Sequence, residues 1–185
     1  MIGRRSVVGI QQKYLNAILA GDLPMATRLV NDAQGDGVSM TSIYIDIITA
    51  AQSKVGEMWL QGSINVAEEH LATTITLDVM NSMRSLNSSP SRTGLRAVVT
   101  PVESDGHSVG AQMFSDLLRS DGWEVDCLAY PTPMDDLVAF VGEREHHLVA
   151  ISLTQLEFLT KAQATAHALH SMSSSLKVLL GGLAL

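Results

Sequence analysis

Cysteine is almost missing from this sequence, and aromatic residues are scarce. Cys127 is the single cysteine in 185 residues, so no disulfide can form within the chain. That excludes a small disulfide-stabilised scaffold and favours a reducing compartment. Because only 4% of the residues are aromatic, the core has to be built from aliphatic side chains and methionine. Cys127 itself lies in an apolar run, where we expect a small buried hydrophobic residue.

Basic residues are also few. Lysine and arginine number 12 against 19 acidic residues, which gives a formal net charge of −7. A nucleic-acid-binding protein usually carries a basic stripe, and none is visible here, so we expect no direct contact with nucleic acid. The sequence also lacks a signal peptide and any uncharged apolar run near the roughly 20 residues that cross a bilayer. We therefore expect a cytoplasmic protein with no membrane partner.

The first part of the chain, residues 1–86, has apolar residues at helical spacing. Two apolar stripes recur at three- and four-residue steps and are separated by a break at 61–63. Two shorter helical segments, 14–20 and 25–30, precede them, and Pro24 suits the first turn of the second. Four helices joined by short turns predict a four-helix bundle. The stripes consist of Ile43, Ile47, Ala51, Val55, Met58 and Trp59, and of Leu71, Ile75, Val79 and Met83.

A polar, breaker-rich stretch at 87–94 predicts a linker, and the pattern changes after it. Over 95–185, short apolar runs alternate with helical segments. That alternation predicts parallel strands with crossover helices, hence a Rossmann-like (flavodoxin-like) α/β domain after the all-α bundle. Ligands of such sheets bind at the carboxyl ends of the strands. The predicted strands are 95–101, 123–130, 148–152 and 177–180, and the predicted helices are 109–118, 134–141 and 158–170.

One short motif follows the first predicted strand. Asp105 stands two residues before His107, and a carboxylate there can accept the second ring hydrogen of a metal-binding histidine. Gly110 would let the start of the next helix approach a bulky planar group. The same pattern also fits a loop histidine capped by an aspartate, so the motif alone leaves both interpretations open. The full run is Asp105, Gly106, His107, Ser108, Val109 and Gly110.

Two further elements follow this motif at defined distances. After Gly110, 41 residues (111–151) lead to Ser152-Leu153-Thr154, and 26 residues (155–180) then lead to Gly181-Gly182. Three elements in this order and at these separations resemble the fingerprint of the cobalamin-binding domain of methionine synthase, several mutases and corrinoid proteins. Thr154 stands where that fingerprint has leucine.

The resemblance to cobalamin-binding domains implies roles for these residues. His107 would be the lower axial ligand to cobalt, with Asp105 behind it. Ser152 would hydrogen-bond the displaced base of the nucleotide tail, and Gly181-Gly182 would leave room beside that tail. Because the family's sheet normally continues beyond the point where this chain ends, the resemblance also implies a sheet domain truncated at its C-terminus.

The bundle carries a second pattern: Trp59, nine further residues, then Glu69-His70. A tryptophan on a helix face is usually core, and an acidic residue at a helix start suits the dipole. The spacing nevertheless resembles cobalamin photoreceptors of the CarH and AerR types, in which a four-helix bundle caps the corrin. The resemblance implies that Trp59 packs on a 5′-deoxyadenosyl group, that Glu69 hydrogen-bonds it and that His70 lines the same pocket.

Leu60 departs from the photoreceptor pattern. The residue after the tryptophan is a histidine in CarH-type proteins and can bind cobalt once light has removed the adenosyl group. Leucine cannot coordinate a metal. Either His70 is the upper ligand in the light state, or water or another ligand stands above cobalt.

Three functions stay open. The leading interpretation is an adenosylcobalamin-binding light sensor that regulates transcription through a partner protein or a fused output domain. The second is a corrinoid carrier that delivers methyl groups to methyltransferases, and the third is a haem-binding sensor built on the same domain. The sequence does not separate a monomer from a homo-oligomer.

The other histidines have no motif around them. His146 and His147 precede the third predicted strand beside charged residues, so we expect them at the surface. His167 and His170 share a helix face, but no carboxylate or cysteine completes a metal site, and we expect them in solvent.

Overall fold

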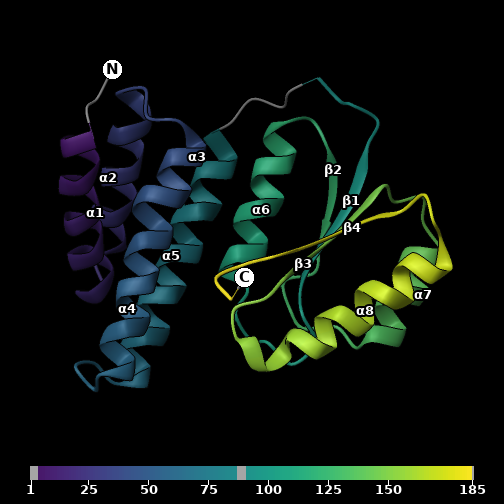
Figure 1. Ribbon diagram of the computed structural model, residues 1–185. Coiled ribbons are helices and arrows are strands. Elements are labelled where there is room, and N and C mark those ends of the chain that lie inside the picture. Colours follow the sequence, from purple (N-terminus) through teal and green to yellow (C-terminus); the bar gives the residue numbers. More distant parts are fainter. Residues whose placement is uncertain (1–3, 87–90, 185) are drawn as a thin grey trace. The chain divides into compact units, whose positions relative to one another are not determined.

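The structure is a computed structural model that describes residues 4–86 and 91–184. The chain divides into two compact units, residues 1–87 and 88–185, and each is described by itself (Figure 1). The linker predicted for 87–94 includes residues 87–90, which lie outside the described part of the chain.

The first unit is helical, as predicted. Helix α1 packs against α2, α4 and α5. Asp22 caps α2, because its carboxylate accepts a hydrogen bond of 2.9 Å from the Met25 amide, and proline occupies the first turn. The elements are α1 (Arg4–Leu19), α2 (Leu23–Gly35), α3 (Met40–Ser42), η1 (Ile43–Thr49), α4 (Ala50–Leu60) and α5 (Val66–Leu86).

Segment η1 is a π-helix, and it joins α3 to α4. The apolar stripe read from Ile43 to Trp59 therefore starts on a wider helical turn than the 3.6-residue period assumes. Ile43, Ile47 and Ile48 in this segment are fully buried, so the wide turn still points these side chains inward, whereas Ile45 is exposed. The period of the sequence predicts the helix but cannot reveal its local widening.

A buried polar network crosses the bundle core. The Tyr14 hydroxyl donates to Thr76 Oγ1 at 3.2 Å, and Gln52 Nε2 donates to the same oxygen at 2.6 Å. Burial raises the pKa of Tyr14 to about 12, partly offset by the Thr76 hydrogen bond, because the ionised phenol would lose its hydration. Tyr14 therefore stays neutral and pairs α1 with α5.

The second unit is a parallel four-stranded sheet with the order β2-β1-β3-β4. Strand β1 pairs with both β2 and β3, and β3 pairs with β4, which confirms the predicted doubly wound α/β fold. The elements are β1 (Arg96–Pro101), α6 (Val109–Ser120), β2 (Glu124–Cys127), α7 (Met134–Gly142), β3 (Leu148–Ser152), η2 (Leu156–Phe158), α8 (Leu159–Met172) and β4 (Lys177–Gly181).

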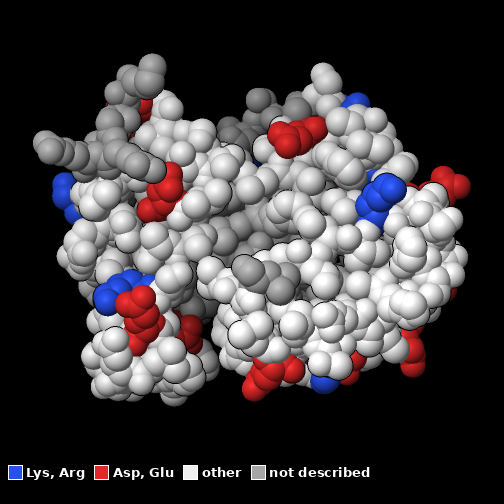
Figure 2. Space-filling model, in the orientation of Figure 1, with Lys and Arg blue, Asp and Glu red and all other residues white. Residues whose placement is uncertain are grey.

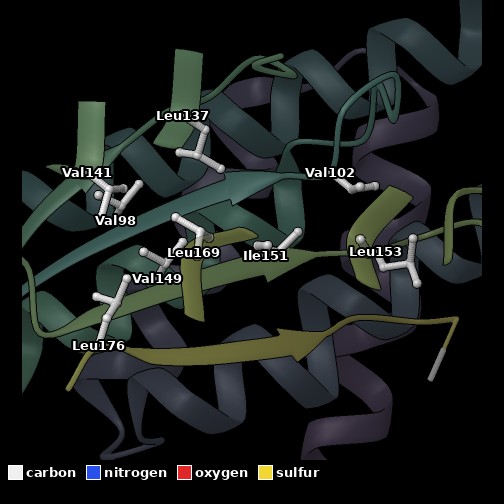
Figure 3. Packing of buried hydrophobic residues seen from close by; sticks show 10 residues of the cluster. Val98, Val102, Leu137, Val141, Val149, Ile151, Leu153, Leu169 and Leu176 are labelled. Carbon is white, nitrogen blue, oxygen red and sulfur yellow. The ribbon is translucent and has the colours of Figure 1, made fainter. Parts of the chain in front are cut away.

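Helices cover both faces of the sheet (Figure 1). On one face, strand residues pack against α7 and α8; Figure 3 labels Val98, Val149 and Ile151 among them. On the other face, Val99 and Ala150 pack against α6. Neighbouring residues of β1 and β3 point to opposite buried faces, which explains why these strands read as continuous apolar runs.

Strand β2 ends earlier than predicted. It stops at Cys127, three residues before the predicted end, and Tyr130 is exposed. Because β2 lies at the edge of the sheet, its side chains have a neighbouring strand on one side only, whereas those of β1 have one on each side. Cys127 is half-buried rather than fully buried.

The prediction for His146 is wrong. Its side chain is fully buried, with Nε2 2.9 Å from Asp126 Oδ2 on β2. The ring also stacks on Phe140 at a centroid distance of 5.9 Å. The carboxylate satisfies Nε2, which offsets part of the cost of burial, whereas Nδ1 has no hydrogen-bond partner among the described residues. His147, His167 and His170 are exposed, as predicted.

On the face drawn in Figure 2, lysine and arginine side chains lie apart from one another. Several arginines form ion pairs with acidic neighbours. Arg92 Nη1 lies 2.8 Å from Glu124 Oε1, and Arg119 Nη1 lies 3.2 Å from Asp116 Oδ1. Among the described helices, none combines the length and apolar character that a membrane span requires.

Candidate functional site

The three sequence elements of the motif meet at the carboxyl edge of the sheet. Pro101 at the end of β1 lies beside Ser152, and Ser152 lies beside Gly181. Backbone bonds continue this contact past the strand ends. The Val102 amide donates to Ser152 O at 2.9 Å, and the Leu153 amide donates to Gly181 O at 2.8 Å. Residues far apart in the sequence thus share one small region.

Asp105 and His107 form a direct contact in the loop between β1 and α6. Asp105 Oδ1 lies 2.6 Å from His107 Nδ1 and accepts a second bond of 3.1 Å from the His107 amide. The carboxylate is completely buried, whereas the His107 side chain is 53% exposed. A neutral ring that donates from Nδ1 leaves the Nε2 lone pair free for a metal.

The second carboxylate oxygen of Asp105 contacts the segment that follows β3. Asp105 Oδ2 accepts a hydrogen bond of 2.8 Å from the Thr154 amide. Three donors therefore satisfy a buried carboxylate, which would otherwise be costly to desolvate. Sequence reasoning placed Thr154 in the site through its side chain and missed this role. Any residue except proline supplies the same amide, so the replacement of leucine by threonine leaves the bond intact.

Two glycines of the motif lie in close contact with their neighbours, and only at Gly182 does the contact exclude a side chain. A Cβ at Gly110 would lie 3.3 Å from Ser152 Oγ, so α6 begins close to the end of β3. A Cβ at Gly182 would lie 2.2 Å from Leu153 O, and its φ of +134° is one that glycine adopts best. By contrast, a Cβ at Gly106 or Gly181 would meet nothing within 4 Å. The end of β4 thus borders open space.

The turn before Asp105 was not predicted. The Asp105 amide donates to Val102 O at 3.0 Å, and Ser104 within this turn has a φ of +74°. Lys161 Nζ on α8 donates to Ser104 Oγ at 2.7 Å. Neither a left-handed serine nor a lysine 57 positions further along has a signature in the local sequence.

The remaining predicted residues lie in the helical unit. Trp59, near the end of α4, is 46% exposed, and Leu60 is 78% exposed. Glu69 is held by the Thr73 hydroxyl, which donates to its Oε1 at 2.9 Å. His70 is exposed, with Nε2 3.6 Å from Glu69 Oε2. Trp59 is therefore not a core residue, and it presents a large apolar surface beside the α4–α5 turn.

The start of α5, which carries Glu69 and His70, is firmly capped. The Asn65 side chain accepts hydrogen bonds from the amides of Ala67 and Glu68 at 2.8 and 3.1 Å. Glu68 returns a bond, because its carboxylate accepts from the Asn65 amide at 2.7 Å. This reciprocal capping fixes the helix start. Glu69 and His70 consequently project from a defined backbone.

The residues at the sheet edge fit a metal held in a planar macrocycle. Such a metal needs one axial nitrogen from the protein, and His107 offers Nε2 with Nδ1 already held by a carboxylate. The open space beside Gly181 and Gly106 leaves room for a bulky group.

Family models match both parts of the chain. Residues 95–185 match a model described as B12 binding domain, and residues 10–82 match a second model with the same description. No curated protein sequence matches the chain at a significant level.

One solved structure shares the fold over most of the chain, and two others show a weaker likeness. The monomethylamine corrinoid protein of Methanosarcina barkeri is 17% identical, with a TM-score of 0.75 over 96% of this chain and 85% of that one. A cobalamin-binding protein of Desulfitobacterium hafniense DCB-2 is 21% identical, with a TM-score of 0.47 over 100% and 86%. The methanol:cobalamin methyltransferase complex MtaBC of Methanosarcina barkeri gives 16% and 0.48 over 99% and 70%. The photoreceptor class stays a prediction.

Proposed function

We propose that this chain, which carries two B12-binding domains, holds a cobalamin with His107 as the ligand below cobalt. The observation that carries the proposal is the contact of 2.6 Å between His107 Nδ1 and Asp105 Oδ1. It leaves Nε2 as the nitrogen that would bind the metal. Because Asp105 is buried and also bound by the Thr154 amide, its carboxylate has little freedom to turn away.

The neighbouring residues have separate tasks. Ser152 would hydrogen-bond the base of the nucleotide tail, and the open side of Gly181 would admit the tail beside β4. Gly182 and Gly110 allow the loops at the sheet edge to approach one another. Gly106, Ser108 and Val109 are the chain neighbours of His107, and they connect it to the start of α6. When bound, an alkylated cobalamin supplies a cobalt–carbon bond that visible light or an alkyl acceptor can break.

We propose further that the chain is a light sensor that prefers adenosylcobalamin. Trp59 would pack against the adenosyl group, and Glu69, oriented by Thr73, would hydrogen-bond it. Leu60 offers no metal ligand, so the exposed His70 ring is the candidate upper ligand in the light state. The signal would pass to a partner protein or a fused output domain.

A second candidate is a methyl-carrying corrinoid protein. The observation that favours it is the fold shared with the Methanosarcina monomethylamine corrinoid protein over 96% of this chain. His107 and Asp105 would have the same roles. Trp59 and Glu69 would have no adenosine to contact, so this candidate predicts no preference for the adenosyl form.

One experiment separates the two candidates. The full chain is titrated in the dark with adenosylcobalamin and with methylcobalamin, and each complex is then illuminated with green light. The light-sensor proposal predicts tighter adenosylcobalamin binding, weakened selectively by Trp59→Ala, and a lasting spectral change after illumination. Equal binding of both forms, by wild type and by Trp59→Ala alike, contradicts the sensor and favours the carrier. A Soret band in protein purified without added cobalamin would instead indicate haem.

A further inference from the structure

The turn that leads into Asp105 contains a strained residue. Ser104 has a φ of +74°, and among the residues that the structure describes it is the only non-glycine with a positive φ. Glycine adopts this region freely, whereas a residue with a Cβ does so at a conformational cost. Since Ser104 directly precedes Asp105, its backbone angle sets the direction in which the buried carboxylate enters the site.

Helix α8 supplies the contact that holds this turn. Lys161 Nζ donates to Ser104 Oγ at 2.7 Å and lies 3.9 Å from Glu103 Oε1. The other oxygen of Glu103 accepts a long bond of 3.4 Å from the Met134 amide at the start of α7. The two crossover helices α7 and α8 therefore both contact the turn, at its strained residue or at the residue before it.

We infer that Lys161 is a positioning residue for the Asp105–His107 pair. By holding Ser104 in the left-handed conformation, Lys161 keeps the Asp105 carboxylate within reach of both His107 Nδ1 and the Thr154 amide. Its ammonium group contacts the turn and lies 6.0 Å from the centroid of the Phe158 ring, and within the described residues no hydrogen bond or ion pair joins it to His107. The consequence for cobalt coordination rests on the proposed function, whereas the consequence for the Asp105 carboxylate does not.

The alternative is an ordinary surface lysine. The Lys161 side chain is 47% exposed, and an exposed ion pair such as that with Glu103 contributes little. The two interpretations differ in their dependence on Ser104. Glycine at position 104 would adopt the same φ without strain and would present no hydroxyl, so a positioning lysine becomes dispensable in Ser104→Gly. A lysine that acts only through surface charge would matter equally in both backgrounds.

The test compares four versions of the full chain: wild type, Lys161→Met, Ser104→Gly and the double variant. Lys177→Met is the matched control, because Lys177 is an exposed lysine at the amino end of β4, away from the site. Lys161→Arg should restore much of the wild-type behaviour, since arginine keeps both the charge and the donors.

The first measurement uses the cofactor-free protein. The amides of His107 and Thr154 both donate to Asp105, so their hydrogen-exchange rates report whether the carboxylate is in place. We expect Lys161→Met to speed both rates about three- to tenfold, the usual scale for a lost bond to a charged group after allowance for exposure. In the Ser104→Gly background the same substitution should change them less than about twofold.

The second measurement is the dissociation constant for adenosylcobalamin in the dark, with the absorbance spectrum as a record of histidine coordination. Lys161→Met should weaken binding by a factor similar to its effect on amide exchange, and only in the Ser104 background. Unchanged amide exchange in Lys161→Met, or equal losses in both backgrounds, would overturn the inference. If wild type binds no cobalamin, the proposed function fails, and amide exchange still decides the role of Lys161.

Discussion

Asp105 meets His107 twice, through the ring Nδ1 at 2.6 Å and through the backbone amide at 3.1 Å. One carboxylate oxygen thereby fixes both the ring and the peptide that carries it. The other oxygen binds the Thr154 amide at 2.8 Å, which ties the loop after β1 to the end of β3. A residue expected only to tune a ligand also joins two of the three motif elements.

Asp105→Asn should weaken cobalamin binding by about ten- to hundredfold, the usual effect of removing the partner of a metal-bound histidine. An amide keeps the shape of the carboxylate but cannot accept from every donor around it. Absorbance titration of the full chain measures the change. Asp116→Asn is the control, because Asp116 is also buried but pairs with Arg119 two turns into α6. Equal effects of the two substitutions would count against the assigned role.

His107→Ala should abolish the spectrum of histidine-bound cobalamin and weaken retention of the cofactor. Free imidazole should restore part of the coordinated spectrum, because it replaces the missing nitrogen without a covalent tether. His167→Ala, a change at an exposed histidine on α8, should behave as wild type. Unaltered retention and spectrum in His107→Ala would remove His107 from the metal site.

Gly182→Ala and Gly181→Ala should differ sharply. The new Cβ at position 182 would lie 2.2 Å from Leu153 O at a φ of +134°, so we expect a loss of about 2–3 kcal/mol in the free energy of unfolding. At position 181 the Cβ meets nothing within 4 Å, so stability should change little while cobalamin affinity falls. Urea denaturation and cofactor titration test both statements. Equal stability of the two variants would contradict the assigned geometry.

The raised pKa of Tyr14 predicts that the protein loses stability at high pH. Its folded pKa of about 12 exceeds the ordinary value of 10.0, so its contribution is complete below pH 10 and disappears as pH rises toward 12. The full loss amounts to about 2–3 kcal/mol. Urea denaturation of wild type and Tyr14→Phe between these pH values isolates the effect, because other titrations are common to both. Parallel curves would contradict it.

Trp59→Ala should lower the free energy of unfolding by only about 1 kcal/mol, because about half of its side chain is already in solvent. Its expected effect is on the ratio of adenosylcobalamin to methylcobalamin affinity. Val8→Ala, a change at another exposed apolar residue of the bundle, should leave that ratio unchanged. A large drop in melting temperature would show instead that Trp59 is a core residue.

Much of this fold could be predicted because its signals are periodic or sit at strand ends. The apolar stripe from Ile43 to Trp59 predicted a helix. The apolar run 148–152 predicted a strand that is buried on both faces. The sequence separations between Gly110, Ser152 and Gly181 predicted that these residues lie close together, because parallel strands bring their carboxyl ends to one edge of the sheet.

What could not be predicted depends on contacts between distant residues. The left-handed Ser104 is held by Lys161, and the His146 ring is buried beside Asp126 on β2, which accepts its ring hydrogen. The π-helix at 43–49 leaves the apolar stripe almost unchanged. The Thr154 amide is invisible to side-chain reasoning, since every residue but proline carries the same group.

The most direct test of the central claim is an electron paramagnetic resonance spectrum of the complex in the cobalt(II) state. The full chain is prepared with ordinary histidine and with 15N-labelled histidine, and each sample is loaded with the same unlabelled cobalamin. If His107 lies below cobalt, each cobalt line is split into a triplet by ordinary nitrogen and into a doublet after labelling, and His107→Ala loses that change. Triplets that persist in the labelled protein would mean that the cofactor's own base remains bound, and would contradict the assignment of His107.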